Sequence, residues 1–153
     1  MTMEILGSNY VMRHFDRGEN PIFFTQLTTK GHKRARALFI PGITRIVSSP
    51  FIRCIQSVEY FARENGIPVY ISCALGEYID CDDHGIPHET KESMRKRVLD
   101  FIKADASTQT LYVTHQSVAE VICGKSLETG GISVVPCGVG LLDPADYPPS
   151  PPK

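Results

Sequence analysis

Short apolar runs alternate along the chain with longer segments in which apolar residues recur every three or four positions. The runs cover residues 9–12, 46–47, 67–71, 110–113, 132–135 and 139–142. Each run is short and mostly apolar on both faces, which is typical of buried strands in a sheet that helices cover. The pattern therefore predicts strands that alternate with helices.

The longer segments have the spacing of amphipathic helices. They cover residues 28–40, 50–65, 90–102 and 116–124. Thr28 is placed to cap the first helix and Pro41 to stop it, while Pro50 is placed at the first helical position of the second. Strands that alternate with helices predict an α/β fold, a three-layer α/β/α sandwich with a mostly parallel central sheet.

The length and composition fit one domain. The chain has 153 residues, and we expect the domain to span residues 1–143, because five prolines in residues 144–153 predict an extended tail. Neither an internal repeat nor a second domain is visible in the pattern.

The charge balance excludes some classes of partner. With 16 Lys and Arg against 17 Asp and Glu, the net charge is -1, which disfavours a nucleic-acid binder held by phosphate contacts. No apolar stretch approaches the roughly 20 residues that span a bilayer, and the first ten residues lack the pattern of a signal peptide. The five cysteines have no paired spacing, which favours a reducing, cytoplasmic setting. The oligomeric state stays open.

Polar side chains follow the predicted strands where each strand ends. Arg13 and His14 follow the first strand, Arg53 lies one turn into the helix after the second, Glu77 lies in the loop after the third, and His115 follows the fourth. In open parallel sheets, ligands bind outside the carboxyl ends of the strands, so these side chains should converge. Two arginines, two histidines and a carboxylate match the needs of phosphoryl transfer, namely cations for the oxygens, a nucleophile and a proton donor.

The same residues lie in a series of motifs. These are an Arg-His pair, a Leu-Thr-x-x-Gly helix start, a Ser-Ser-Pro-x-x-Arg-x-x-Gln-Ser segment, an acidic residue and a Val-x-His ending. They occupy, in this order, residues 13–14, 27–31, 48–57, 77 and 113–115, followed by a Pro-Cys-Gly-Val segment at 136–139. In content and order, the chain resembles the histidine phosphatase superfamily, also called phosphoglycerate mutase-like, over roughly residues 8–143.

The resemblance implies a role for each matching residue. It implies that His14 is the nucleophile that becomes phosphohistidine, and that Arg13, Arg53 and His115 line the phosphate pocket. Glu77 is similar to the general acid of the family. The implied reaction needs no cofactor and no metal. His14 must be unprotonated to attack, which its ordinary pKa of about 6.5 permits near neutral pH.

Two positions depart from the family pattern. Phe15 stands where the family has Gly, and Gln116 stands where Gly or Ala is common. Phe15 could narrow the pocket or favour an aromatic leaving group, and Gln116 could bind a phosphoryl oxygen. Either substitution could instead weaken catalysis, which keeps open a pseudophosphatase that binds phosphate or a phosphopeptide without hydrolysing it.

Other polar residues near these motifs allow alternative interpretations. Asp16 lies close enough to His14 to take over part of the acid role. Cys81, His84 and His88 are residue types that ligate zinc, but their spacing is loose and no second cysteine pair accompanies them.

The sequence thus favours a phosphatase that hydrolyses a phosphomonoester or phosphoramidate. The phosphorylated partner is a small metabolite or a phosphoprotein, and the reaction passes through phosphohistidine. The chain lacks the long inserts of the related mutases, so a mutase is the less favoured interpretation. The sequence does not choose between the small phosphohistidine phosphatases and the protein-tyrosine phosphatase branch.

Overall fold

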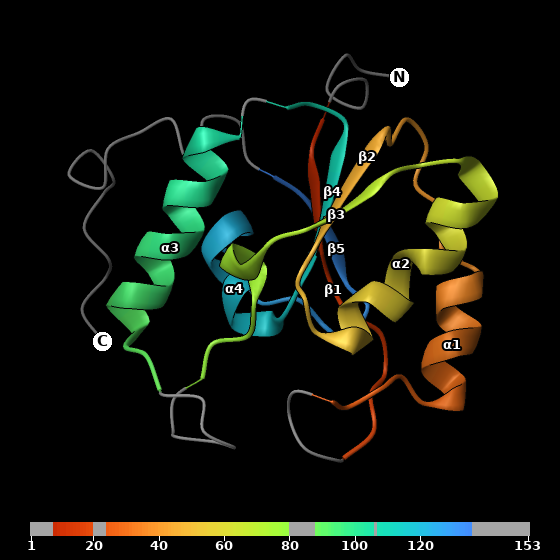
Figure 1. The fold of residues 1–153 in the computed structure, drawn as a ribbon, viewed down its shortest axis with the longest axis horizontal. Coiled ribbons are helices and arrows are strands. Elements are labelled where there is room, and N and C mark those ends of the chain that lie inside the picture. Colours follow the sequence, from red (N-terminus) through yellow and green to blue (C-terminus); the bar gives the residue numbers. More distant parts are fainter. Residues whose placement is uncertain (1–7, 20–23, 80–87, 106, 136–153) are drawn as a thin grey trace.

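A five-stranded sheet forms the centre of the protein (Figure 1). The structure, a computed structural model, describes residues 8–19, 24–79, 88–105 and 107–135. In chain order the elements are β1 (Tyr10–Arg13), α1 (Thr29–Arg36), β2 (Arg45–Ser48), α2 (Ile52–Asn65), β3 (Val69–Ile71), the short 3-10 helix η1 (Cys73–Leu75), α3 (Lys91–Ala104), β4 (Thr110–Thr114), α4 (Gln116–Cys123) and β5 (Ile132–Val134). The strand order across the sheet is β3-β2-β4-β1-β5.

The sheet is mostly parallel and separates two apolar cores. Strands β1 to β4 run parallel to their neighbours, and β5 pairs antiparallel with β1. Helices α1 and α2 cover one face of the sheet and helices α3 and α4 the other (Figure 1). Because successive side chains of a strand point to opposite faces, Met12 enters the core under α1 and α2 while Val11 enters the core under α3 and α4. The predicted α/β sandwich is confirmed.

Most predicted boundaries shift by one or more residues, and three of these shifts have a clear physical cause. Helix α1 ends at Arg36, before Pro41, because the chain leaves the helix to bury Ile40 in the core. Helix α2 begins at Ile52, after Pro50, because Phe51 stays extended at the N-cap. Strand β3 begins only at Val69, since Pro68 has no N–H to contribute to a strand ladder. The N-cap predicted at Thr28 is confirmed, because its side chain accepts a hydrogen bond from Gly31 N–H.

The two edge strands are less buried than their apolar composition predicts. Tyr70 and Ile71 in β3 and Ile132 and Val134 in β5 are exposed. The helices cover the three central strands, so the expectation of burial on both faces is wrong for the edges.

Part of the sequence-based prediction lies outside the described residues. This applies to the strand predicted at residues 139–142 and to the proline-rich tail at 144–153. Within the described ranges, none of the helices is both long enough and apolar enough to cross a membrane.

Candidate active site

The register of the sheet brings the ends of three strands together. Arg13 pairs with Thr114, and Ser48 pairs with Val113, so β1, β4 and β2 finish at one edge. The backbone continues this alignment, because His14 N–H donates to Thr114 O at 3.1 Å. His14 and His115 are therefore the first residues beyond two adjacent strands, and their ring centroids lie 5.4 Å apart.

His14 has the protonation state of a nucleophile. Its Nδ1 lies 2.7 Å from the carbonyl oxygen of Phe15, which can only accept, so Nδ1 carries the proton and Nε2 keeps its lone pair. Burial of the ring, which is 3% exposed, lowers the pKa of His14 to about 3. The charges of His115, Arg53 and Arg13 act in the same direction, while the bond to Phe15 opposes them. His14 is consequently neutral at physiological pH.

His115 lies within a chain of hydrogen bonds. Its Nδ1 is 3.2 Å from Glu77 Oε2, a contact of ion-pair length that lacks the geometry of a hydrogen bond, and the neighbouring carboxylate favours the proton on Nδ1. Nε2 then accepts from the Ser49 hydroxyl at 2.9 Å, and Ser49 Oγ accepts in turn from Phe51 N–H at 3.2 Å. Burial lowers the pKa of His115, against the opposing effect of Glu77. The connectivity of Ser49, His115 and Glu77 resembles that of a hydrolase triad, but the Ser49 hydroxyl is held between His115 Nε2 and Phe51 N–H, as a residue that orients His115 would be.

Arg53 brings a positive charge into the site from the first turn of α2. The residue has no exposed surface, and its Nη2 donates to Glu77 Oε2 at 3.3 Å. Its guanidinium carbon lies 4.9 Å from the centre of the Phe51 ring, a cation–π arrangement that fixes the plane of the group. A buried, oriented guanidinium is well suited to hold a phosphoryl group.

Glu77 is ionised in this arrangement. Burial alone would raise its pKa, but the close approach of His115 Nδ1 and the charge of Arg53 outweigh burial and lower the pKa of Glu77 to about 2. The second carboxylate oxygen accepts from Tyr78 N–H at 3.1 Å. Glu77 thus occupies the donors of Arg53 and His115 that a phosphoryl group would use.

Of the two remaining predicted site residues, Arg13 lies beside His14 and Gln116 points elsewhere. Arg13 lines a cavity of about 310 Å³ beside His14 and donates to Leu127 O at 3.2 Å. The Gln116 side chain is exposed and donates to Ser126 Oγ at 3.0 Å. The structure therefore brings His14, Arg13, Arg53, Glu77 and His115 to one edge of the sheet, and the side chain of Gln116 is directed elsewhere.

Phe15 points away from the cavity. Its ring is buried in the core under α1 and α2, and the Arg34 guanidinium lies 5.1 Å from the ring centre. Gly130 makes this possible, because a Cβ at that position would lie 2.6 Å from the ring. Asp16, the alternative acid, lines the same cavity as Arg13 and His14, and Arg34 Nη1 of α1 donates to its carboxylate at 2.9 Å.

The other residues of the motifs hold the backbone of the site. Thr28 N–H donates to Asp16 O at 2.9 Å, and Gly31 lies so close that an added Cβ would be 2.2 Å from the same oxygen. Gly31 is therefore needed for the close approach of α1 to the loop after His14.

Helix α2 holds two further backbone segments with consecutive side chains. Gln56 Oε1 accepts from Leu27 N–H at 2.9 Å, and Ser57 Oγ accepts from Phe15 N–H at 3.0 Å. The sequence contained these residues within a recognisable motif, but gave no signal for their backbone partners.

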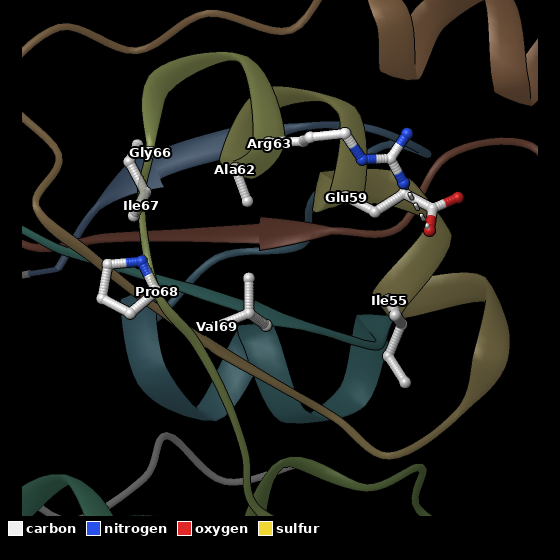
Figure 2. A pocket seen from close by; sticks show the side chains of 8 residues that line it. All are labelled: Ile55, Glu59, Ala62, Arg63, Gly66, Ile67, Pro68 and Val69. Carbon is white, nitrogen blue, oxygen red and sulfur yellow. Dashed lines mark ion pairs between the residues drawn. The ribbon is translucent and has the colours of Figure 1, made fainter.

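A larger cavity, of about 540 Å³, lies beside α2 and β3 and offers no catalytic groups (Figure 2). Apolar side chains such as Ile55, Ala62 and Val69 surround it, and its two charged residues, Glu59 and Arg63, pair with each other at 3.9 Å. This cavity is therefore a poor candidate for the active site.

A cysteine nucleophile and a metal site have little support among the described residues. Burial raises the pKa of the Cys54 thiol to about 12, which excludes a thiolate nucleophile next to His115. Among the residues that the structure describes, no group of three metal-ligating side chains comes together. Cys81 and His84 of the zinc interpretation lie outside the described residues, so that interpretation stays untested.

Comparisons by sequence identify no relative, since neither a protein-family profile nor a curated protein matches the chain. Solved structures do match. An alpha-ribazole phosphatase from Shigella flexneri superposes with a TM-score of 0.67 over 83% of this chain and 89% of its own, at 18% identity. The chain has the histidine phosphatase fold.

Two further solved structures agree with this fold. A phosphoserine phosphatase from Entamoeba histolytica, in complex with 3-phosphoglyceric acid, superposes with a TM-score of 0.62 over 83% of this chain and 89% of its own, at 15% identity. A mycobacterial glucosyl-3-phosphoglycerate phosphatase gives a TM-score of 0.63 over 82% and 88%, at 14% identity. At these identities the likeness establishes the fold alone.

Proposed function

We propose that the protein is a phosphatase that hydrolyses a phosphomonoester or phosphoramidate through a phosphohistidine on His14. The observation that carries this proposal is the state of His14. Its Nδ1 proton is fixed on the Phe15 carbonyl, its ring is neutral, and Arg13, Arg53 and His115 lie around it. The fold shared with three phosphatases supports the same activity.

The first step forms the phosphoenzyme. The Nε2 lone pair of His14 attacks phosphorus, so a P–N bond forms while the P–O or P–N bond to the leaving group breaks. Arg13, Arg53 and His115 hold the phosphoryl oxygens and stabilise their charge in the transition state. The electron pair of the broken bond stays on the leaving group, which takes a proton from Glu77.

The second step returns the enzyme to its starting state. A water molecule attacks phosphorus, its proton passes to Glu77, and the P–N bond breaks with its electrons returning to Nε2. Inorganic phosphate then leaves, and Glu77, again beside Arg53 and His115, releases its proton to solvent. No cofactor is required for either step.

Glu77 must be protonated to act as the acid, although it is ionised before substrate binds. An arriving phosphoryl dianion takes over Arg53 and His115, the two groups that lower the pKa of Glu77. It also adds negative charge beside the carboxylate, which raises the pKa. Bound substrate therefore lets Glu77 take up a proton from solvent, and Glu77 passes this proton to the leaving group.

Covalent labelling tests this proposal. The protein is mixed with a radiolabelled aryl phosphate, quenched within milliseconds to seconds, and examined for a label that is stable to base and labile to acid. We expect the label on His14 and none in His14→Ala. A label that persists in His14→Ala would refute the assignment.

The alternative is a module that binds phosphate without turnover. The ion pair between Glu77 and Arg53 supports this alternative, because Glu77 occupies an N–H donor that a phosphate would use. Phosphate binding by calorimetry, together with neither phosphoenzyme nor turnover of aryl phosphates, would favour this alternative.

A further inference from the structure

Arg97 of α3 connects four residues around the proposed acid. Its Nη1 donates to Ala74 O at 2.7 Å, and its Nη2 donates to Gly76 O at 3.0 Å and to Glu77 O at 3.3 Å. The remaining partner is Glu89, whose carboxylate accepts from Arg97 Nε at 3.0 Å and from Nη2 at 2.5 Å. One side chain thus binds three carbonyls of the segment that ends in Glu77.

This segment has little regular structure of its own. The 3-10 helix η1 ends at Leu75, and Glu77 lies two residues beyond it. From the opposite side, the Thr114 hydroxyl donates to Leu75 O at 2.6 Å. The end of β4 and helix α3 therefore hold the segment between them, and this fixes where the Glu77 backbone lies.

The guanidinium group suits this task better than other side chains. It presents five N–H donors in a rigid plane, so it can reach several carbonyls and a carboxylate at once. Glu89 keeps the group oriented, and Glu89 N–H donates to Ile79 O at 2.9 Å, so the same pair also holds the backbone just after Glu77.

We propose that Arg97 is a positioning residue that sets the reach of the Glu77 carboxylate toward the leaving group. The inference rests on the proposed phosphatase function, because it assigns Glu77 the role of acid. The hydrogen bonds of Arg97 reach the backbone of residues 74–77 and the Glu89 carboxylate, and not His14 or Arg53. The charge of Arg97 also lowers the pKa of His115, an effect that Arg97→Lys keeps and Arg97→Gln removes.

The dependence on the leaving group separates positioning from general support of the fold. The leaving oxygen of an alkyl phosphate needs a proton. The leaving group of nitrophenyl phosphate is a stable nitrophenolate, which needs little help from an acid. We expect Arg97→Gln to lower kcat for an alkyl phosphate about 10²-fold, the scale of a lost general acid. The kcat for nitrophenyl phosphate should stay within about threefold, and KM should change little for both substrates, since Arg53 and His115 remain.

Three further variants complete the experiment. Arg97→Lys keeps the charge but loses the planar fork, so it should restore part of the alkyl activity, and it decides the question if Arg97→Gln does not fold. Arg97→Gln added to Glu77→Gln should cause no further loss on the alkyl substrate, because the acid is already absent. Arg95→Gln, on the exposed side of the same helix, is the matched control and should leave both activities unchanged.

The possible outcomes distinguish the two proposals. In Arg97→Gln, or in Arg97→Lys if Arg97→Gln does not fold, an equal loss of kcat on both substrates would overturn the positioning role. No loss of kcat on either substrate would overturn it as well. In both cases the proposed phosphatase activity would stand. A full additional loss in the double variant would overturn it as well. A wild-type protein that hydrolyses neither substrate would overturn the proposed function and this inference with it.

Discussion

Replacing Phe15 tests whether the residue obstructs the active site or only fills the core. The ring is 5% exposed and packs into the core under α1 and α2, with Arg34 above it. Removing a buried Phe ring in Phe15→Ala should cost about 3–5 kcal/mol of unfolding free energy. For a domain of this size, that corresponds to a decrease in Tm of roughly 6–20 °C.

The activity of Phe15→Ala should change little despite this loss. The backbone N–H and carbonyl of Phe15, which bind Ser57 and His14, are the same in Ala. We therefore expect kcat/KM for nitrophenyl phosphate within about threefold of wild type, measured at a temperature where both proteins are folded.

The assay combines urea unfolding with steady-state kinetics and includes Phe39→Ala as a control. The Phe39 ring is 64% exposed, so its removal should cost about 1 kcal/mol or less. An increase in kcat/KM of tenfold or more in Phe15→Ala would mean that the ring narrows the pocket. A loss of stability no larger than that of Phe39→Ala would contradict the burial of the ring.

The remaining predictions concern three residues of the site. Arg53→Ala should lower kcat/KM about 10³-fold, with partial recovery in Arg53→Lys, and activity within about threefold of wild type would place Arg53 outside the site. Because the pKa of His14 is lowered to about 3, its ring stays unprotonated down to that pH. We therefore expect no decrease of kcat/KM from protonation of His14 between about pH 5 and 7. The measured profile is first corrected for the ionisation of the substrate itself, which has a pKa near 6. A decline centred near pH 6.5 that persists after this correction would contradict a neutral His14. Gly31→Ala should destabilise the protein by about 1–3 kcal/mol in urea unfolding, although Ala is the better helix former, because its Cβ would meet Asp16 O; unchanged stability would contradict the close approach of α1.

The convergence of the residues that follow the strands was predictable from sequence patterns. His14 and His115 directly follow β1 and β4, and a parallel sheet brings such positions to one edge whatever the details of packing. The place of Arg53 was predictable as well, because it lies in the first turn of the helix that follows β2. The α/β sandwich was predictable for the same reason, since periodicity reports which faces are buried.

Features that depend on distant partners were not predictable. The direction of the Phe15 ring depends on the absence of a side chain at Gly130, and no residue near Phe15 in the sequence indicates this. Gln116 turns to Ser126, a choice between rotamers of an exposed side chain that no pattern encodes. Arg97 is one of several basic residues on an amphipathic helix, and only the tertiary structure reveals the carbonyls that it binds.

Phe at position 15 is compatible with an active site because the position contributes its backbone. Phe15 N–H donates to Ser57 Oγ, and Phe15 O fixes the proton on His14 Nδ1. Both contacts use the backbone, so they do not depend on the side chain at this position. The φ angle of Phe15 is not positive, so the backbone conformation does not favour glycine there. What the larger residue requires is space on the side away from His14, and Gly130 provides it. The Phe15–Gly130 pair thus accommodates the ring and leaves the proton of His14 Nδ1 on the Phe15 carbonyl.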